Sequence, residues 1–131
     1  MTQQPTSHKP NAMPLILIAE HDQALGTLIA EMLTMSGYRC RHVMLLGSLP
    51  LPSRTEPIQL LICRLGPGTT GGLDLEMVRR MQERLAPVPV LAYTPDLSYR
   101  EMCPSLSGIA AILPMPFEME ELLATVARLT R

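Results

Sequence analysis

Segments with strand-like patterns recur at five places along the chain. They span residues 14–19, 38–44, 59–63, 88–93 and 109–113. Most of them are short and continuously apolar, as in the run PLILIA at 14–19. Such runs are typical of strands that are buried on both faces of a parallel sheet. The pattern therefore predicts five buried strands.

Apolar residues with helical spacing lie between these segments. The first helix is expected after Asp22, which stands at the N-cap position, and it should stop at Gly37. Further helices are expected over 73–85, over a short segment at 96–102, and from 119 to 129. Acidic residues in the first turn of the last helix and arginines at its end suit the helix dipole.

The alternation of strands and helices defines the fold class. It indicates βαβ units and an α/β domain of the flavodoxin-like, doubly wound type, with a five-stranded parallel sheet and helices on both faces. Ligands of such domains bind at the carboxyl ends of the strands. The candidate residues at that edge are Glu20, His21, Asp22, Cys63, Arg64, Thr94 and Met115.

Length and composition fit one globular domain. The chain has 131 residues, and residues 1–12 are polar and contain two prolines, so we expect a disordered tail at 1–12 and a single domain at 13–131. The net charge of −1 does not favour nucleic acid or an anionic membrane as a partner. Three cysteines without an export signal indicate reduced thiols and a cytoplasmic protein.

Four segments carry a resemblance to a known family. They are 16–25 (ILIAEHDQAL), 57–75, 89–94 (PVLAYT) and 108–117 (GIAAILPMPF), and in the second a proline and a glycine follow Cys63 by four and eight residues. In their order and separation these segments resemble the response-regulator receiver domain (CheY-like) of bacterial two-component and phosphorelay signalling. The resemblance extends over nearly the whole chain.

The resemblance implies five chemical roles at the carboxyl edge of the sheet. Two acidic residues hold Mg²⁺, an aspartate accepts the phosphoryl group, and a threonine and a lysine bind its oxygens. The corresponding positions carry Glu20, His21, Cys63, Thr94 and Met115. Three of the five depart from the family pattern. We therefore expect a degenerate pseudo-receiver that lacks the phosphoacceptor aspartate and has no catalytic residue, resident metal or cofactor.

The same residues also carry groups suited to other chemistry. Cys63 could be a reactive thiol, but a buried, inert cysteine is favoured, since on a strand Arg64 should point to the opposite face. Glu20, His21, Asp22 and Cys63 together offer the ligand types that Zn²⁺ accepts, although no motif spacing supports such a site.

A glycine-rich loop at 66–71 fits the dinucleotide-binding pattern GxGxxG. The acidic residue expected about 20 positions later is missing. Pro67 also removes one N–H from the loop. We interpret the segment as a turn.

A partner face is suggested by methionines, of which the chain has ten. Met102 and Met119, together with Ile112 at the position where the family usually has an aromatic switch residue, suggest a docking surface; the alternative is that the methionines fill the core. We expect a stand-alone, non-enzymatic receiver-like domain that acts by phosphorylation-independent protein–protein interaction. Its partner would be a histidine kinase, another regulator or an output protein, and a homodimer is possible. The alternative is a ligand, metal or redox sensor that uses Cys63 and the vacated pocket.

Overall fold

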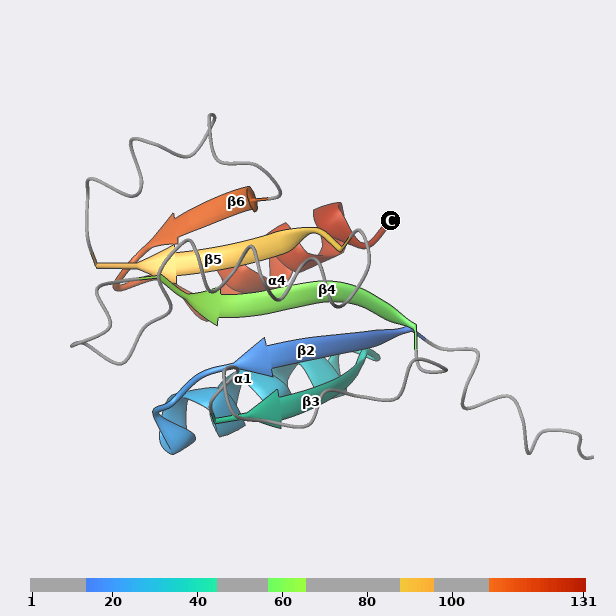
Figure 1. The fold of residues 1–131 in the computed structure, drawn as a ribbon, viewed down its shortest axis with the longest axis horizontal. Coiled ribbons are helices and arrows are strands. Elements are labelled where there is room, and N and C mark those ends of the chain that lie inside the picture. Colours follow the sequence, from blue (N-terminus) through green and yellow to red (C-terminus); the bar gives the residue numbers. More distant parts are fainter. Residues whose placement is uncertain (1–13, 45–56, 66–87, 96–108) are drawn as a thin grey trace, which may run out of the picture.

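The computed structural model describes residues 14–44, 57–65, 88–95 and 109–131. Within these ranges five strands form one sheet, in which every pairing is parallel and the order is β3-β2-β4-β5-β6 (Figure 1). The strands are β2 (Leu15–Ala19), β3 (Arg39–Val43), β4 (Ile58–Arg64), β5 (Val90–Thr94) and β6 (Ile109–Pro114). The described helices are α1 (Gln23–Met35) and α4 (Met119–Leu129).

This strand order confirms the doubly wound α/β prediction. From β2 the chain first moves outward to β3 and then returns past β2 to β4, after which it proceeds to β5 and β6. The direction of winding therefore reverses between β2 and β4. In open parallel sheets this reversal creates the crevice in which ligands bind, outside the carboxyl ends of the strands.

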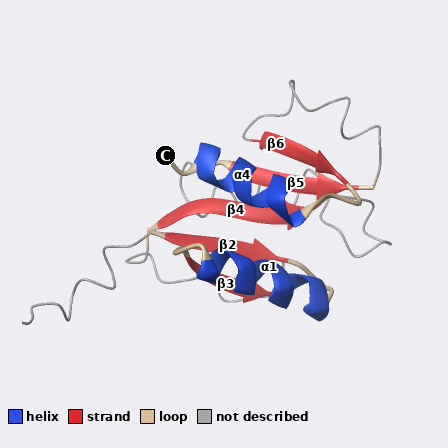
Figure 2. Cartoon of the chain, turned by 180° about the vertical axis from the view of Figure 1, so that it is seen from behind, coloured by secondary structure: helices blue, strands red, loops and turns tan. Residues whose placement is uncertain are grey.

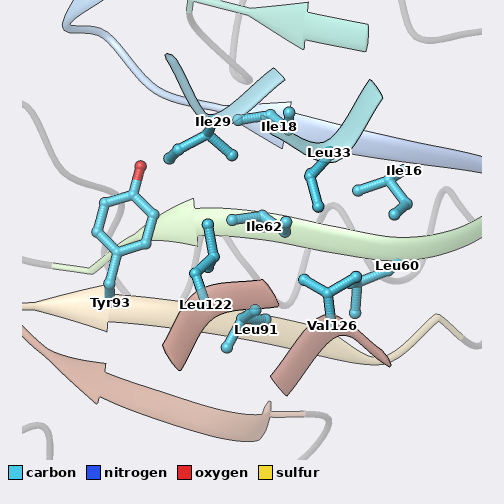
Figure 3. Packing of buried hydrophobic residues seen from close by; sticks show 10 residues of the cluster. All are labelled: Ile16, Ile18, Ile29, Leu33, Leu60, Ile62, Leu91, Tyr93, Leu122 and Val126. Carbon is cyan, nitrogen blue, oxygen red and sulfur yellow. The ribbon is translucent and has the colours of Figure 1, made fainter. Parts of the chain in front are cut away.

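Both faces of the sheet are buried. Helices α1 and α4 lie side by side over one face (Figure 2). Their apolar residues meet alternate strand residues in one cluster, which consists of Ile16, Ile18, Ile29, Leu33, Leu60, Ile62, Leu91, Tyr93, Leu122 and Val126 (Figure 3). The intervening strand residues, among them Leu17, Leu61 and Val90, form a second buried cluster on the opposite face. This alternation follows from the two-residue period of a strand.

Several predictions fall on residues that are not described. The tail at 1–12, the glycine-rich loop at 66–71, the helices expected over 73–85 and 96–102, and Met102 all lie outside the described ranges. The two described helices, of 13 and 11 residues, are both too short to span a bilayer.

The start of α1 is fixed as the sequence predicts. Asp22 is its N-cap, and its Oδ1 accepts hydrogen bonds from the backbone N–H groups of Ala24 (3.0 Å) and Leu25 (3.2 Å). These bonds satisfy two of the N–H groups that lack partners in the first turn of a helix. Gly37 follows the helix with φ of +97°, a conformation that glycine adopts at no steric cost. The cap therefore fixes the start of α1 directly after Glu20 and His21.

Candidate functional site

Three side chains from neighbouring strands form a row at the carboxyl edge of the sheet. Ala19 of β2 is in register with Cys63 of β4, so Glu20, the next residue, lies beside Arg64. Arg64 is in turn in register with Tyr93 of β5. The strand period places all three on the face that α1 and α4 cover. We call Glu20, Arg64 and Tyr93 the carboxyl-edge row.

The carboxylate of Glu20 is the centre of this row. Its Oε1 accepts hydrogen bonds from the Tyr93 hydroxyl and from Arg64 Nε, the latter at 3.3 Å. Its Oε2 accepts from Arg64 Nη2 at 3.0 Å and from the backbone N–H of Asp22 at 2.8 Å. Two of the four donors come from one guanidinium, the bidentate arrangement that gives strong, directional pairs. The carboxylate thus joins β2, β4, β5 and the start of α1.

Burial makes this ion pair necessary. The Glu20 side chain is fully buried, whereas that of Arg64 is 18% exposed. An isolated carboxylate in such surroundings would lose its hydration without compensation, which is why buried charges are paired. The Arg64 guanidinium also lies over the Tyr93 ring, with Cζ 5.9 Å from the ring centroid. The charge of Glu20 is therefore balanced within the protein itself.

Tyr93 supplies a neutral donor to the same carboxylate. Its buried ring reaches from β5 towards β2 (Figure 3). The ring of Phe117 lies 5.3 Å away between centroids. Burial and the hydrogen bond to Glu20 raise the pKa of Tyr93 well above its ordinary value. The hydroxyl therefore keeps its proton and remains a donor to Oε1.

Cys63, at the predicted phosphoacceptor position, faces away from the carboxyl-edge row. It is fully buried in the apolar cluster of the opposite face, with Leu17, Leu61 and Ala92 among the members. Burial first, and the negative charge of Glu20 second, raise the pKa of its thiol to about 12. The thiol is therefore protonated at neutral pH, whereas nucleophilic chemistry requires the thiolate.

His21 and Asp22 lie next to the row. The His21 side chain is 38% exposed, and its Nδ1 lies 3.2 Å from Glu20 Oε2 without the geometry of a hydrogen bond. Asp22 is exposed, and its Oδ1 caps α1. In the part of the chain that the structure describes, no three His, Cys, Asp or Glu side chains are grouped closely enough to hold a metal ion. The zinc arrangement considered for Glu20, His21, Asp22 and Cys63 is not formed there.

The remaining candidates are divided between the two faces. Thr94 is buried at the end of β5, and its carbonyl oxygen accepts from the Met115 N–H at 2.9 Å. Met115 and Met119 are half-buried against the cluster under α1 and α4, whereas Ile112 packs against the opposite cluster. A docking surface that included both Ile112 and Met119 would therefore have to continue around the β6 edge of the sheet.

His42 connects the edge strand β3 to the same site. Its Nε2 donates a hydrogen bond to the carbonyl oxygen of Glu20 at 2.8 Å. The imidazole passes so close to α1 that a Cβ on Gly26 would lie 2.0 Å from Nε2. Gly26 therefore leaves the space through which His42 reaches the backbone of Glu20.

The sequence placed Glu20 and Arg64 among the candidates at this edge, but it did not predict their contact and gave no role to Tyr93 or His42. The expected alternation of side chains along β4 was correct, since Arg64 faces away from Cys63. If the carboxyl ends of β2, β4 and β5 are assumed to lie level with one another, the sequence places Arg64 and Tyr93 beside Glu20. No local motif marks this row.

Comparison with known proteins gives the same fold. No family model matches the chain. It is 31% identical over 121 residues to the DNA-binding dual master transcriptional regulator RpaA of Synechocystis sp., a match that covers 91% of this chain and 50% of the relative. The chain thus spans about half the length of that curated relative.

Solved structures of receiver domains are similar over most of the chain. The non-phosphorylated HemR receiver domain from Leptospira biflexa has a TM-score of 0.64 and 26% identity, over 89% of this chain and 94% of that one. The response regulator TrrA from Thermotoga maritima, solved in complex with Mg²⁺–BeF, has a TM-score of 0.64 and 20% identity, over 89% and 99%.

The chain therefore has the flavodoxin-like fold of response-regulator receiver (CheY-like) domains. The HemR receiver domain, at 26% identity over most of both chains, supports a receiver domain of the kind found in response regulators.

Proposed function

We propose that this chain is a receiver-like module of two-component or phosphorelay signalling that acts by protein–protein interaction and without phosphorylation on aspartate. Its partner would be a histidine kinase, another response regulator or an output protein. We further propose that it is not an enzyme, that it works in the cytoplasm, and that nucleic acid is not its partner. The name of the relative describes DNA binding, but this chain matches only about half of that protein.

The observation that carries the proposal is the state of Cys63. Phosphoryl transfer to a receiver needs an exposed carboxylate nucleophile beside a cation, in line with the leaving oxygen. Position 63 instead holds a fully buried thiol with a pKa of about 12, in an apolar cluster. The lysine position holds Met115, which packs half-buried against apolar neighbours. A protonated thiol cannot replace the carboxylate nucleophile, and a thioether cannot replace the lysine ammonium.

The alternative of a redox or metal sensor at Cys63 is less well supported. Redox-sensing cysteines combine a low pKa with solvent access, and this thiol has neither. We therefore retain interaction with a protein partner as the function that the site favours.

Treatment of the purified protein with Mg²⁺ and either acetyl phosphate or beryllofluoride tests the proposal. We expect no saturable change in the backbone NMR signals of Glu20 and Thr94, and no phosphate adduct by mass spectrometry. A Cys63→Ser variant is the matched control, since it separates acetylation of the thiol from phosphorylation elsewhere. A phosphate adduct on the wild-type chain, or saturable shifts at these two residues, would contradict the proposal.

The interaction itself is tested by affinity capture with the same chain, in parallel with and without acetyl phosphate. The captured regulator or kinase should be the same in both samples, because no phosphorylated state exists to change the surface. Repeated capture that depends on acetyl phosphate would show that the module is phosphorylation-dependent. Sedimentation of the purified chain would decide whether a homodimer forms.

A further inference from the structure

The fold family implies Mg²⁺ at the carboxyl edge, so the donors at that edge decide whether the ion fits. Mg²⁺ requires six oxygen ligands in near-octahedral geometry and is usually held through one or two carboxylates. An ionised carboxylate offers about four lone-pair sites. Glu20 uses all of them, since Oε1 and Oε2 each accept from two donors. The buried carboxylate therefore has no acceptor site left for a metal ion.

The neighbouring groups do not complete a site for the ion either. Asp22 Oδ1 is engaged by two N–H groups of α1, and Cys63 belongs to the opposite face. His21 adds a nitrogen, which Mg²⁺ does not favour. The donor set of the described residues thus disagrees with the metal that the fold family implies.

We propose that Arg64 is an internal cation that takes the place of the divalent metal at the carboxyl edge. Its guanidinium neutralises Glu20 from within the chain, so the charge balance of the pair does not depend on metal concentration. Its two hydrogen bonds span both carboxylate oxygens, and Tyr93 and the Asp22 N–H fill the remaining sites. Arg64 is therefore a positioning residue that holds β2, β4 and β5 in one arrangement and excludes divalent cations from Glu20.

The register of the strands makes this substitution possible. Arg64 directly follows the phosphoacceptor position, but the strand period turns it towards α1 and α4. There it meets Glu20, which directly follows β2. The inference concerns cation binding alone and does not depend on the proposed partner interaction.

Paramagnetic Mn²⁺, which also prefers oxygen ligands, provides the test. Added to the ¹⁵N-labelled wild-type chain, it should cause no saturable loss of the amide signals of Glu20, Asp22 and Tyr93. In the Arg64→Met variant, Mn²⁺ should cause a saturable loss of these amide signals, because the carboxylate recovers free acceptor sites. In the Glu20→Gln/Arg64→Met double variant, the signals should again be unaffected by Mn²⁺. Arg128→Met, which removes the same charge from an exposed site on α4, should behave like wild type.

Two outcomes would overturn the inference. One is saturable Mn²⁺ broadening at Glu20 in the wild-type chain. The other is an Arg64→Met variant that folds but shows no saturable Mn²⁺ broadening at Glu20. If that variant does not fold, the wild-type side chain still gives a decision: the Arg64 Nε–H signal should be unshifted by Mg²⁺, and displacement of that signal would refute the internal cation. Mn²⁺ binding without a phosphate adduct would overturn this inference and leave the proposed function intact.

Discussion

A double-mutant cycle on Glu20 and Arg64 measures how strongly the ion pair stabilises the fold. Removal of one partner from a buried pair typically costs about 3–5 kcal/mol, because the other charge is left uncompensated. In Arg64→Met, the Tyr93 hydroxyl and the Asp22 N–H still donate to Glu20, which places the loss near the lower end, at about 3 kcal/mol. Glu20→Gln leaves a guanidinium that is 18% exposed and can reach water, so about 1–2 kcal/mol is expected.

The double variant Glu20→Gln/Arg64→Met removes both charges and places a methionine against the Tyr93 ring. We expect its loss of stability to be about 2–3 kcal/mol smaller than the two single losses together, because the uncompensated carboxylate is gone. Urea unfolding followed by circular dichroism measures each free energy of unfolding. Arg128→Met, on the exposed side of α4, serves as a control and should change stability by less than about 0.5 kcal/mol.

Additivity would refute this reasoning. If the loss of the double variant equals the sum of the single losses within about 0.5 kcal/mol, the two charges do not interact energetically. The contacts at 3.0 and 3.3 Å would then have no measurable coupling, and the role of Arg64 as a counter-charge would be wrong.

Three further predictions follow from burial and capping. The thiol of Cys63 has a pKa of about 12 in the fold against an ordinary value of 9.0, so its contribution to the free energy of unfolding should be full below about pH 9 and fall as pH rises towards 12. In urea titrations, Cys63→Ala should therefore lose less stability at alkaline pH than wild type. An unchanged pH profile would contradict this prediction. Asp22→Ala should lower the free energy of unfolding by about 1 kcal/mol through loss of the α1 cap, whereas Asp22→Asn should retain most of it. Leu122→Ala should cost about 2–5 kcal/mol in thermal or urea unfolding, while the exposed Ala124→Ser on the same helix should change little.

The elements of the fold could be predicted because each is encoded locally. The apolar run at 14–19 corresponds to β2, and Asp22 caps α1 as expected. The observed strand β6, Ile109–Pro114, extends one residue beyond the prediction. Buried parallel strands have few polar interruptions, so the sequence alone marks their positions.

The contacts of the candidate site are not encoded locally. Glu20 and Arg64 are 44 positions apart, and Glu20 and Tyr93 are 73 apart. Their contact depends on the pairing register of three strands, which no short sequence window contains. The cysteine at position 63 can be read from one position of the sequence, whereas the contact of Arg64 with Glu20 can be seen only in the three-dimensional arrangement.

The carboxyl-edge row also constrains how this chain can change in evolution. A single change of Cys63 to aspartate would place an unpaired carboxylate in the apolar cluster on the opposite face, while the acceptor sites of Glu20 stay filled. If Arg64 is the internal cation proposed above, phosphorylation at position 63 with Mg²⁺ at Glu20 would also require Arg64 to change, and we expect that change alone to destabilise the fold. Among related chains, the residues at positions 20, 64 and 93 should consequently change together.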